Sequence, residues 1–327
     1  MTQGIKHFFS FFAKEDSCCV VIVADPDAMA SALAVKRLIV RRVAGVTIAA
    51  VNEITRPDNL AMIRYLRIPI VGWKEEMRFA FHKFILVDGQ PHHSPAFHDI
   101  PFAAVIDHHP SVPEHPVYAA YVDVRPSFGA TATILTRYLQ ASHIRPSSYL
   151  ATALQYGIHT DTMAFARSGD EADLRAFQFL RKYSDHGLLR RILHSEYLIQ
   201  WLPMFNRAFF SLKPCGTGYY AYVDNVSNPD VLVGIADFFM RIHGIKWVAV
   251  SGVYEETAVI IFRGDGTRNI GRFAAERFQA LGSAGGHRRL ARAEFSLNHI
   301  PEGVKKQAFI LKRLLSGTRA KNLQVTN

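Results

Sequence analysis

The chain has 327 residues, 49% of them hydrophobic, which excludes a wholly disordered protein and suits two domains of ordinary size. Its 38 Lys and Arg residues outnumber 28 Asp and Glu residues. The resulting formal charge of +10 favours an anionic partner such as nucleic acid, a nucleotide or anionic lipid. A basic protein without such a partner is the alternative, because net charge does not show whether the charges cluster.

The cysteine content argues against a disulfide or zinc framework. The chain has three cysteines, Cys18, Cys19 and Cys215, and none of them forms a C-x-x-C pair. Because no disulfide framework is indicated, we expect the protein to reside in a reducing cytoplasm. The apolar patch at residues 7–12 is too short to span a membrane and lacks a signal-peptide cleavage pattern. We expect it to form a helix that docks on the fold, with membrane contact as the less favoured alternative.

The first half of the chain alternates short apolar runs with helical patterns. Strands are predicted at residues 18–24, 46–51, 84–87 and 103–106, and helices at 28–43 and 57–66. Apolar runs without alternation, separated by helices, indicate a parallel sheet covered on both faces. The expected architecture is therefore a doubly wound α/β domain.

The second half begins with helices and then returns to an α/β pattern. Helices are predicted at 130–140, 146–158, 170–183 and 186–198, and a boundary near 195–215. Beyond it we expect a strand at 219–223, a helix at 229–243, a hairpin of 247–254 with 258–262, and a helix at 270–281. The tail, 305–327, should be a basic helix with a frayed end. The predicted organisation is a first domain at 1–195, a linker at 196–214 and a smaller α/β domain with a basic tail at 215–327.

Acidic residues stand where three of the predicted strands end. Asp25 and Asp27 follow the first strand, Asp88 follows the third, and the run Asp107-His108-His109 follows the fourth. The carboxyl ends of parallel strands line the ligand crevice of an open sheet, so these side chains should meet. A lone strand-end Asp is usually a turn former. Several of them beside imidazoles, with Asp161 after a predicted helix, favour a bound cation such as Mn²⁺ or Mg²⁺.

These runs resemble, in order along the chain, the motifs of the DHH phosphoesterases. Asp107-His108-His109 looks like the run that names the family, residues 25–31 resemble its D-x-D-x-x-x-S motif, and Val87-Asp88 resembles motif II. Residues 157–162 resemble the G-x-x-T-D-T motif. Further along, Arg263 and Gly285-Gly286-His287 resemble signatures of the DHH-associated C-terminal domain. The match spans residues 18–295, and the family includes RecJ-type exonucleases, nanoRNase/pAp phosphatases, cyclic-dinucleotide phosphodiesterases and short-chain polyphosphatases.

The resemblance implies a hydrolase with one or two divalent metal ions, Mn²⁺ or Mg²⁺, that activate a water for attack on phosphorus. His109 would face the substrate phosphate, and Asp107 would orient the histidines. The implied ligands are Asp25 and Asp88 for the first ion, and Asp27, Asp88, His108 and Asp161 for the second. Phosphate binding at the substrate end would involve Arg263, Gly285, Gly286, His287, Arg288 and Arg292.

Two positions depart from the family pattern. Motif I usually begins with a His four residues before the first Asp, where this chain has Val21. The first ion would lose its only imidazole and should bind weakly, or only together with substrate phosphate. Arg292 replaces a Gly, which predicts either a more anionic ligand or a solvated basic face. His92, His93 and His159 are candidate replacement ligands, although a loop or packing role is the simpler interpretation.

The leading hypothesis is a metal-dependent phosphoesterase acting on a nucleotide, a short oligonucleotide or single-stranded nucleic acid. The alternative, to which Val21 points, is a nucleotide- or nucleic-acid-binding protein that kept the fold and lost efficient catalysis. A cyclic-dinucleotide enzyme is less favoured because no sensory or membrane module precedes the DHH region. Tyr219, Tyr220 and Tyr222 could stack on bases, but strand aromatics are more often core residues. Substrate identity, cleavage polarity and oligomeric state, a homodimer included, stay open.

Overall fold

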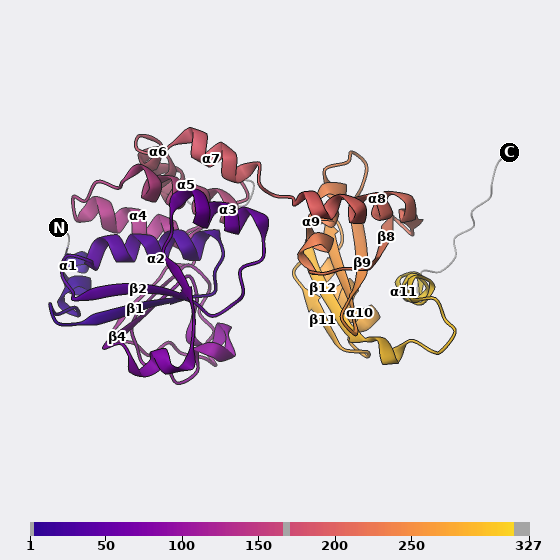
Figure 1. Ribbon diagram of the computed structural model, residues 1–327, viewed down its shortest axis with the longest axis horizontal. Coiled ribbons are helices and arrows are strands. Elements are labelled where there is room, and N and C mark those ends of the chain that lie inside the picture. The colour runs from indigo at the N-terminus through magenta and orange to yellow at the C-terminus, as the bar shows by residue number, and fades with distance from the viewer. Residues whose placement is uncertain (1–2, 166–170, 317–327) are drawn as a thin grey trace. The chain divides into compact units, whose positions relative to one another are not determined.

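The structure, a computed structural model, describes residues 3–165 and 171–316 and divides into two compact units (Figure 1). The first unit is Met1–Ser195 and the second is Glu196–Asn327. Each unit has its own six-stranded sheet, so the predicted α/β class is confirmed for both.

The sheet of the first unit is entirely parallel, in the order β3-β2-β1-β4-β5-β6. Its strands are β1 (Ser17–Ile22), β2 (Gly45–Ala50), β3 (Ile70–Gly72), β4 (Lys83–Val87), β5 (Phe102–Asp107) and β6 (Tyr121–Val124). The four predicted strands are present. The two edge strands, β3 and β6, were not predicted, because three or four residues at a sheet edge carry too little apolar pattern.

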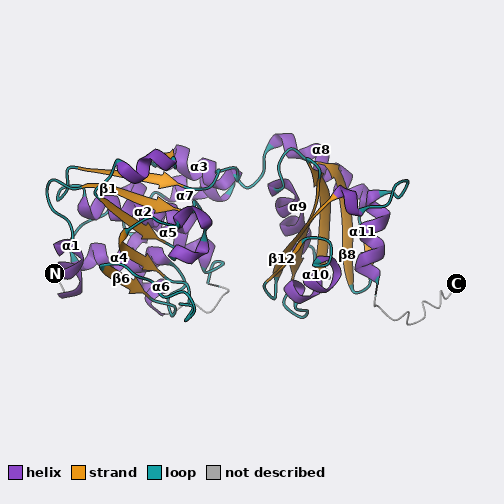
Figure 2. Cartoon of the chain, turned by 90° about the horizontal axis from the view of Figure 1, so that it is seen from below, coloured by secondary structure: helices purple, strands orange, loops and turns teal. Residues whose placement is uncertain are grey.

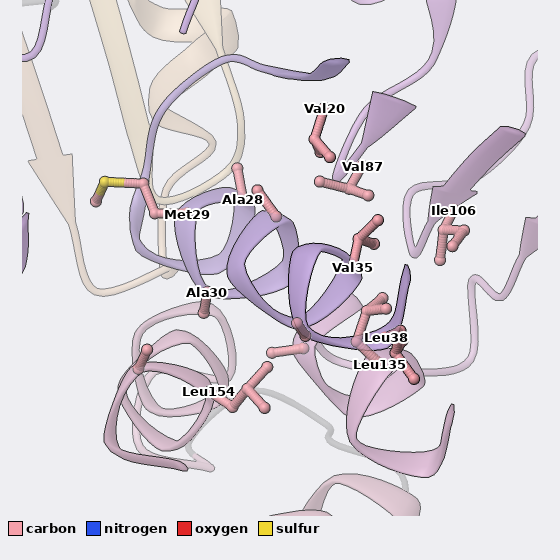
Figure 3. Packing of buried hydrophobic residues seen from close by; sticks show 14 of the residues in the cluster. Val20, Ala28, Met29, Ala30, Val35, Leu38, Val87, Ile106, Leu135 and Leu154 are labelled. Atoms are coloured by element: carbon pink, nitrogen blue, oxygen red, sulfur yellow. The ribbon is translucent and has the colours of Figure 1, made fainter. Parts of the chain in front are cut away.

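Helices lie on one face of this sheet in two layers. α2 (Pro26–Ile39) and α4 (Thr131–Ala141) pack on the strands, and α3 (Pro57–Leu66), α5 (Ser148–Asp161), α6 (Glu171–Arg181) and α7 (His186–Leu193) pack on these helices or on one another. Their apolar faces form one core with the sheet, and Figure 3 shows α2 packed between Val20 and Val87 of the sheet and Leu154 of α5. The predicted helix at 186–198 is shorter in the structure, ending at Leu193.

The other face of the sheet is covered differently from the expectation. Among the described residues, three 3₁₀ turns lie there: η1 (Glu75–Phe79), η2 (Pro91–His93) and η3 (Pro95–Phe97). With the adjoining loops they bury a separate apolar cluster that includes Val21, Phe84 and Leu86. The connections on either side of β4 are short, and the one after it contains Pro91, Pro95 and Pro101, which disfavour a full crossover helix.

The N-terminal apolar patch forms the docked helix that the sequence predicts. In α1 (Gln3–Ser10), Phe8 is fully buried, and its ring contacts those of Tyr121 and Tyr138. Phe9 and Phe12 are buried as well. None of the helices in the described part of the chain has the length and apolar character needed to cross a bilayer.

The start of α2 is fixed by its own sequence and by its packing against α5. Pro26 occupies the first turn, and the Asp25 side chain accepts a hydrogen bond from the Ala28 N–H at 2.9 Å. On α5, a Cβ added to Gly157 would lie 3.1 Å from the Cα of Asp27. Glycine at position 157 therefore lets α5 approach the first turn of α2 closely.

The second unit has a mixed sheet in the order β11-β12-β10-β9-β8-β7, in which only the β8–β9 pair is parallel. The strands are β7 (Lys213–Cys215), β8 (Gly218–Asn225), β9 (Trp247–Tyr254), β10 (Thr257–Gly264), β11 (Ser283–Gly286) and β12 (Leu290–Ser296). Helix α9 (Asp230–Met240) packs on one face, and α10 (Ile270–Phe278) with α11 (Lys306–Leu315) packs on the other (Figure 2). The predicted hairpin of β9 and β10 is confirmed.

The segment predicted as a linker, residues 196–214, contains the turn Ile199–Trp201 and helix α8 (Leu202–Ser211), whose Phe205 and Ala208 are buried in the core. Tyr220 is fully buried and shares a 2.8 Å hydrogen bond with the Ser251 hydroxyl, so the favoured interpretation of this strand tyrosine as a core residue is confirmed. The predicted frayed end, from residue 317 onwards, lies outside the described residues.

Candidate metal centre

The acidic residues of the first unit converge because their strands are neighbours. β1 pairs with β4, and β4 pairs with β5, all in parallel, so their carboxyl ends lie at the same edge of the sheet. Asp25 follows β1, Asp88 follows β4, and Asp107 ends β5. Asp161 is the last residue of α5 rather than part of the loop beyond it, and α5 packs on α2.

Four side chains form a tight candidate metal centre. One ligand atom from each lies within 4.8 Å of the ligand atoms of the others, and the four are Asp27, Asp88, His108 and Asp161. The Nε2 atom of His108 is 3.2 Å from Asp161 Oδ2 and 3.6 Å from Asp88 Oδ1. Three carboxylates and one imidazole at this spacing match the oxygen-rich donor set that Mn²⁺ and Mg²⁺ prefer.

The orientation of His108 fits a metal ligand. Its Nδ1 lies 3.2 Å from the carbonyl oxygen of Phe128, which can only accept, so Nδ1 donates a proton there. Its Nε2 is buried and has no partner with hydrogen-bond geometry, although carboxylate oxygens are close. A buried imidazole nitrogen left free by a backbone contact on the opposite side of the ring is the arrangement that metal sites use.

The charges of this cluster are unbalanced without a cation. Burial, and then the neighbouring Asp88 and Asp161, raise the pKa of Asp27 well above its usual range, and burial with Asp161 raises that of Asp88. Although burial acts to lower it, Asp161 and Asp88 raise the pKa of His108 to about 9. A divalent ion would replace that proton and neutralise the carboxylates.

The first residues of α4, together with Phe128 before it, contact three of the four candidate ligands, and the sequence did not predict these contacts. The Asp27 carboxylate accepts hydrogen bonds from the N–H groups of Thr131 at 2.6 Å and Ala132 at 2.8 Å. The Thr131 hydroxyl donates to Asp88 Oδ1 at 2.9 Å, and Phe128 supplies the carbonyl for His108. The only sequence signal was a small-residue helix start at 129–131, which by itself predicts a cap and no partner.

The second His of the DHH run has its own support. Nδ1 of His109 is 2.8 Å from Oδ1 of the buried Asp107, and this contact raises the pKa of His109. Burial acts to raise the pKa of Asp107, but hydrogen bonds from His109 and Gln90 lower it overall. Gln90, fully buried, donates to Asp107 Oδ2 at 2.8 Å and to the His109 carbonyl at 3.1 Å. Nothing in the sequence singled out Gln90, because its partner stands seventeen positions away.

The residues assigned to a first ion are not gathered in the same way. Asp25 retains solvent access, and in the described part of the chain it belongs to no group of three ligand atoms within 4.8 Å. Desolvation by the surrounding protein and the charges of Asp88 and Asp161 nevertheless raise its pKa. Val21 is fully buried in the apolar cluster on the other face of the sheet.

The candidate replacement histidines are placed unequally. His93 shares a group of close ligand atoms with Asp107 and His109, but its Nδ1 accepts the Gln90 N–H at 3.2 Å. Burial lowers the pKa of His159, which lies on α5. Neither His92 nor His159 is part of a close ligand group among the described residues.

In the second unit, several basic residues named by the motifs are engaged within the unit. Arg263 Nε donates to Asp237 Oδ1 at 2.7 Å, and Arg288 Nε donates to the Gly266 carbonyl at 2.7 Å. Arg292 forms an ion pair with Glu294.

Gly285 and Gly286 of this unit differ in why glycine is suited to each position. Gly286 has a φ of +143°, and a Cβ there would lie 2.4 Å from the Leu290 carbonyl oxygen. A Cβ on Gly285 would meet nothing within 4 Å. Gly285 pairs with Arg292 in the sheet, and the backbone N–H of His287 is bonded to Leu290.

Comparison with known proteins places this geometry in context. No family model matches the chain. It is 33% identical over 303 residues to an uncharacterized protein of Methanocaldococcus jannaschii, covering 92% of this chain and 62% of that protein. The chain thus spans less than two thirds of the length of this relative.

Solved structures extend the comparison to the whole fold. An exopolyphosphatase-related protein from Bacteroides fragilis superimposes with a TM-score of 0.74 at 18% identity, covering 96% of this chain and 97% of that one. RecJ from Thermus thermophilus, solved in complex with Mn²⁺, gives a TM-score of 0.55 at 14% identity, covering 96% of this chain and 54% of RecJ. With its parallel sheet, mixed second sheet and Asp/His cluster, the chain has the fold of the DHH-family phosphoesterases.

Proposed function

We propose that this chain is a divalent-metal-dependent phosphoesterase that hydrolyses nucleotides or short oligonucleotides. The observation that carries the proposal is the buried Nε2 of His108, which faces the carboxylates of Asp27, Asp88 and Asp161. Three buried carboxylates around one imidazole repel one another, and a divalent cation would offset that repulsion. The Mn²⁺ bound by the structurally similar RecJ supports Mn²⁺ as the ion, with Mg²⁺ as the alternative.

In this proposal Asp27, Asp88, His108 and Asp161 would hold the ion. When bound, it would supply positive charge for phosphate oxygens and lower the pKa of a water. Asp107 holds His109 by its Nδ1, which leaves Nε2 of His109 to donate to a phosphate oxygen. Asp107 and Gln90 therefore act on the substrate only through the position of His109.

The second unit would bind the anionic part of the ligand. Arg263, His287, Arg288 and Arg292 supply charge, and Gly285 with Gly286 allows a phosphate to approach the backbone. Arg263 is already paired with Asp237, so a phosphate would have to share or displace that carboxylate. Binding should weaken steeply with salt if phosphate contacts dominate.

A hydrolysis panel tests the proposal. The full chain is incubated with pAp, dinucleotides, cyclic dinucleotides, polyphosphate and single-stranded DNA, with Mn²⁺ and with Mg²⁺. We expect release of product from at least one nucleotide substrate, lost in His108→Ala. No hydrolysis of any substrate with either ion, by a protein that binds the ion, would refute a phosphoesterase function.

The second candidate function is a nucleotide-binding protein with impaired catalysis. Val21 favours it, because this buried valine stands where an imidazole would complete a first ion site, and Asp25 has no close partner there. Val21→His separates the two functions. In a phosphoesterase with a weak first site it should raise Mn²⁺ affinity and turnover, at some cost in stability from a buried polar ring. In a binding protein turnover would stay absent.

A further inference from the structure

A pocket in the first unit is not used by the metal centre. It has a volume of about 300 Å³, within the range of small-molecule sites, and lies between η2–η3 and the loop that follows β5. Its walls include three imidazoles, a phenol and a carboxylate, which belong to His92, His98, His115, Tyr118 and Glu114.

The walls of this pocket offer flat aromatic surfaces. The rings of His92 and His115 are stacked, with centroids 5.0 Å apart and planes 18° apart. Tyr118 is 82% exposed, so its ring is open to a stacking partner. Nδ1 of His92 is buried and has no hydrogen-bond partner. A planar ligand would supply the exposed Tyr118 ring with a stacking partner.

Ring contacts connect the pocket to the metal centre. His92 contacts His93 at 4.4 Å between centroids, and His93 contacts His109 at 5.3 Å. His109 in turn contacts the metal-ligand candidate His108 at 4.3 Å. The pocket and the metal centre therefore lie at the two ends of one row of imidazoles, and a group attached to a phosphate at the centre could extend along it.

The chemistry of the pocket selects among ligands. The negative charge of Glu114 would repel a second phosphate in the pocket, which argues against a polyphosphate chain. The Glu114 carboxylate can instead accept hydrogen bonds from an exocyclic amino group of a base. A metal ion is a poor fit, since no pocket-wall residue joins a close group of ligand atoms in the described part of the chain. Imidazole and phenol rings are the surfaces on which nucleobases stack.

We propose that this pocket, defined by His92, Glu114, His115 and Tyr118, is a nucleobase subsite that selects bases with an amino group. The proposal rests on the proposed function for the position of the phosphate, and it narrows the substrate class to nucleotides whose base stacks beside the DHH run. Stacking would be contributed by Tyr118 and by the His92–His115 pair, and edge recognition by Glu114.

Calorimetric binding to the full chain with Mn²⁺ tests the subsite. The probes are guanosine, GMP, UMP and ribose 5-phosphate, which carries the sugar phosphate without a base. GMP should bind roughly 10–100-fold more tightly than ribose 5-phosphate, the scale of one stacked base. Tyr118→Ala and His115→Ala should remove most of that difference while leaving the affinities for ribose 5-phosphate and Mn²⁺ unchanged. Glu114→Gln should narrow the gap between GMP and UMP.

The matched control is Phe79→Ala, which removes another highly exposed aromatic ring of the same unit, outside the pocket. It should leave all affinities unchanged. Equal affinities for GMP and ribose 5-phosphate, unaffected by Tyr118→Ala, would overturn the subsite and leave the metal centre standing. Tyr118-dependent binding of GMP, together with no hydrolysis of any substrate in the panel, would support the subsite and contradict the phosphoesterase function. No binding of any probe would overturn the subsite, while the hydrolysis panel decides the phosphoesterase function separately.

Discussion

The first residue of α4 provides a test of the metal centre that leaves every candidate ligand in place. Thr131→Val keeps the shape of the side chain and the backbone N–H that binds Asp27, and removes only the 2.9 Å hydroxyl bond to Asp88. A hydrogen bond to a charged group contributes roughly 1.5–3 kcal/mol. Loss of a group that orients a metal ligand typically weakens metal binding by about 10–100-fold. The hydrogen-bond energy and the expected loss of metal affinity agree, because about 1.4 kcal/mol corresponds to a tenfold change in affinity.

The assay is calorimetric titration of Mn²⁺ into the wild type and Thr131→Val, with thermal unfolding of both metal-free proteins. A matched control lies on the same helix. The Thr136 hydroxyl is also buried, but it donates to the Ala132 carbonyl at 2.7 Å and contacts no carboxylate in the described structure. Thr136→Val should lower stability slightly and leave Mn²⁺ affinity unchanged. Thr131→Ser, which retains the hydroxyl, should restore most of the affinity.

Unchanged Mn²⁺ affinity in a folded Thr131→Val protein would refute the reasoning. It would mean either that Asp88 is not a ligand or that its position does not depend on the Thr131 hydroxyl. An equal loss in Thr131→Val and Thr136→Val would point to a general loosening of α4 instead.

Three further predictions address protons, stability and the second unit. Since the pKa of His108 is about 9 in the metal-free protein, Mn²⁺ binding near neutral pH should release roughly one proton from it. Affinity should rise with pH up to about 9, and calorimetry in buffers of different ionisation enthalpy measures the release. Burial and Asp161 raise the pKa of Asp88 in the folded protein above its unfolded value. The ionised Asp88 therefore destabilises the metal-free fold most at pH values above the folded pKa. The destabilisation declines as the pH falls from the folded pKa towards the unfolded one. Asn tolerates the φ of 59° at position 88, so the Asp88→Asn protein should fold. It should have a higher melting temperature than the wild type at pH 7 without metal, and Mn²⁺ should no longer stabilise it. A lower melting temperature of the metal-free variant would contradict the assignment of a destabilising charge to Asp88. Arg263→Ala should weaken binding of an anionic ligand by roughly 10–100-fold without changing Mn²⁺ affinity, whereas Asp237→Asn, which releases the guanidinium, should strengthen it. Ligand titrations at two salt concentrations measure both, and equal affinities in all three proteins would remove Arg263 from the binding surface.

The sequence predicted those parts of the molecule that depend on local pattern. Buried runs such as Cys18–Ile22 identify central parallel strands, because both faces of such strands are apolar. Once the strands are parallel, the topology of the sheet brings Asp25, Asp88 and Asp107 to one edge. The order of the motifs along the chain then indicates the DHH fold.

The sequence could not supply the contacts that tertiary packing creates. Thr131 and Gln90 look like ordinary polar residues until the fold places them against Asp88 and Asp107. The pocket that contains His92 and His115 depends on two loops whose approach no periodicity encodes. Helix α8 was mistaken for a linker because Pro203 and the turn at 213–218 suggested a break, whereas its apolar residues pack on the second sheet.

The most direct test of the central claim is the anomalous scattering of Mn²⁺ in crystals of the full chain. The account predicts a strong peak within bonding distance of His108 Nε2 and of carboxylate oxygens from Asp27, Asp88 and Asp161. It also predicts a weaker second peak, or none, beside Asp25. The absence of any peak at His108 at saturating Mn²⁺, or a dominant peak elsewhere, would contradict the proposed metal centre and the function built on it.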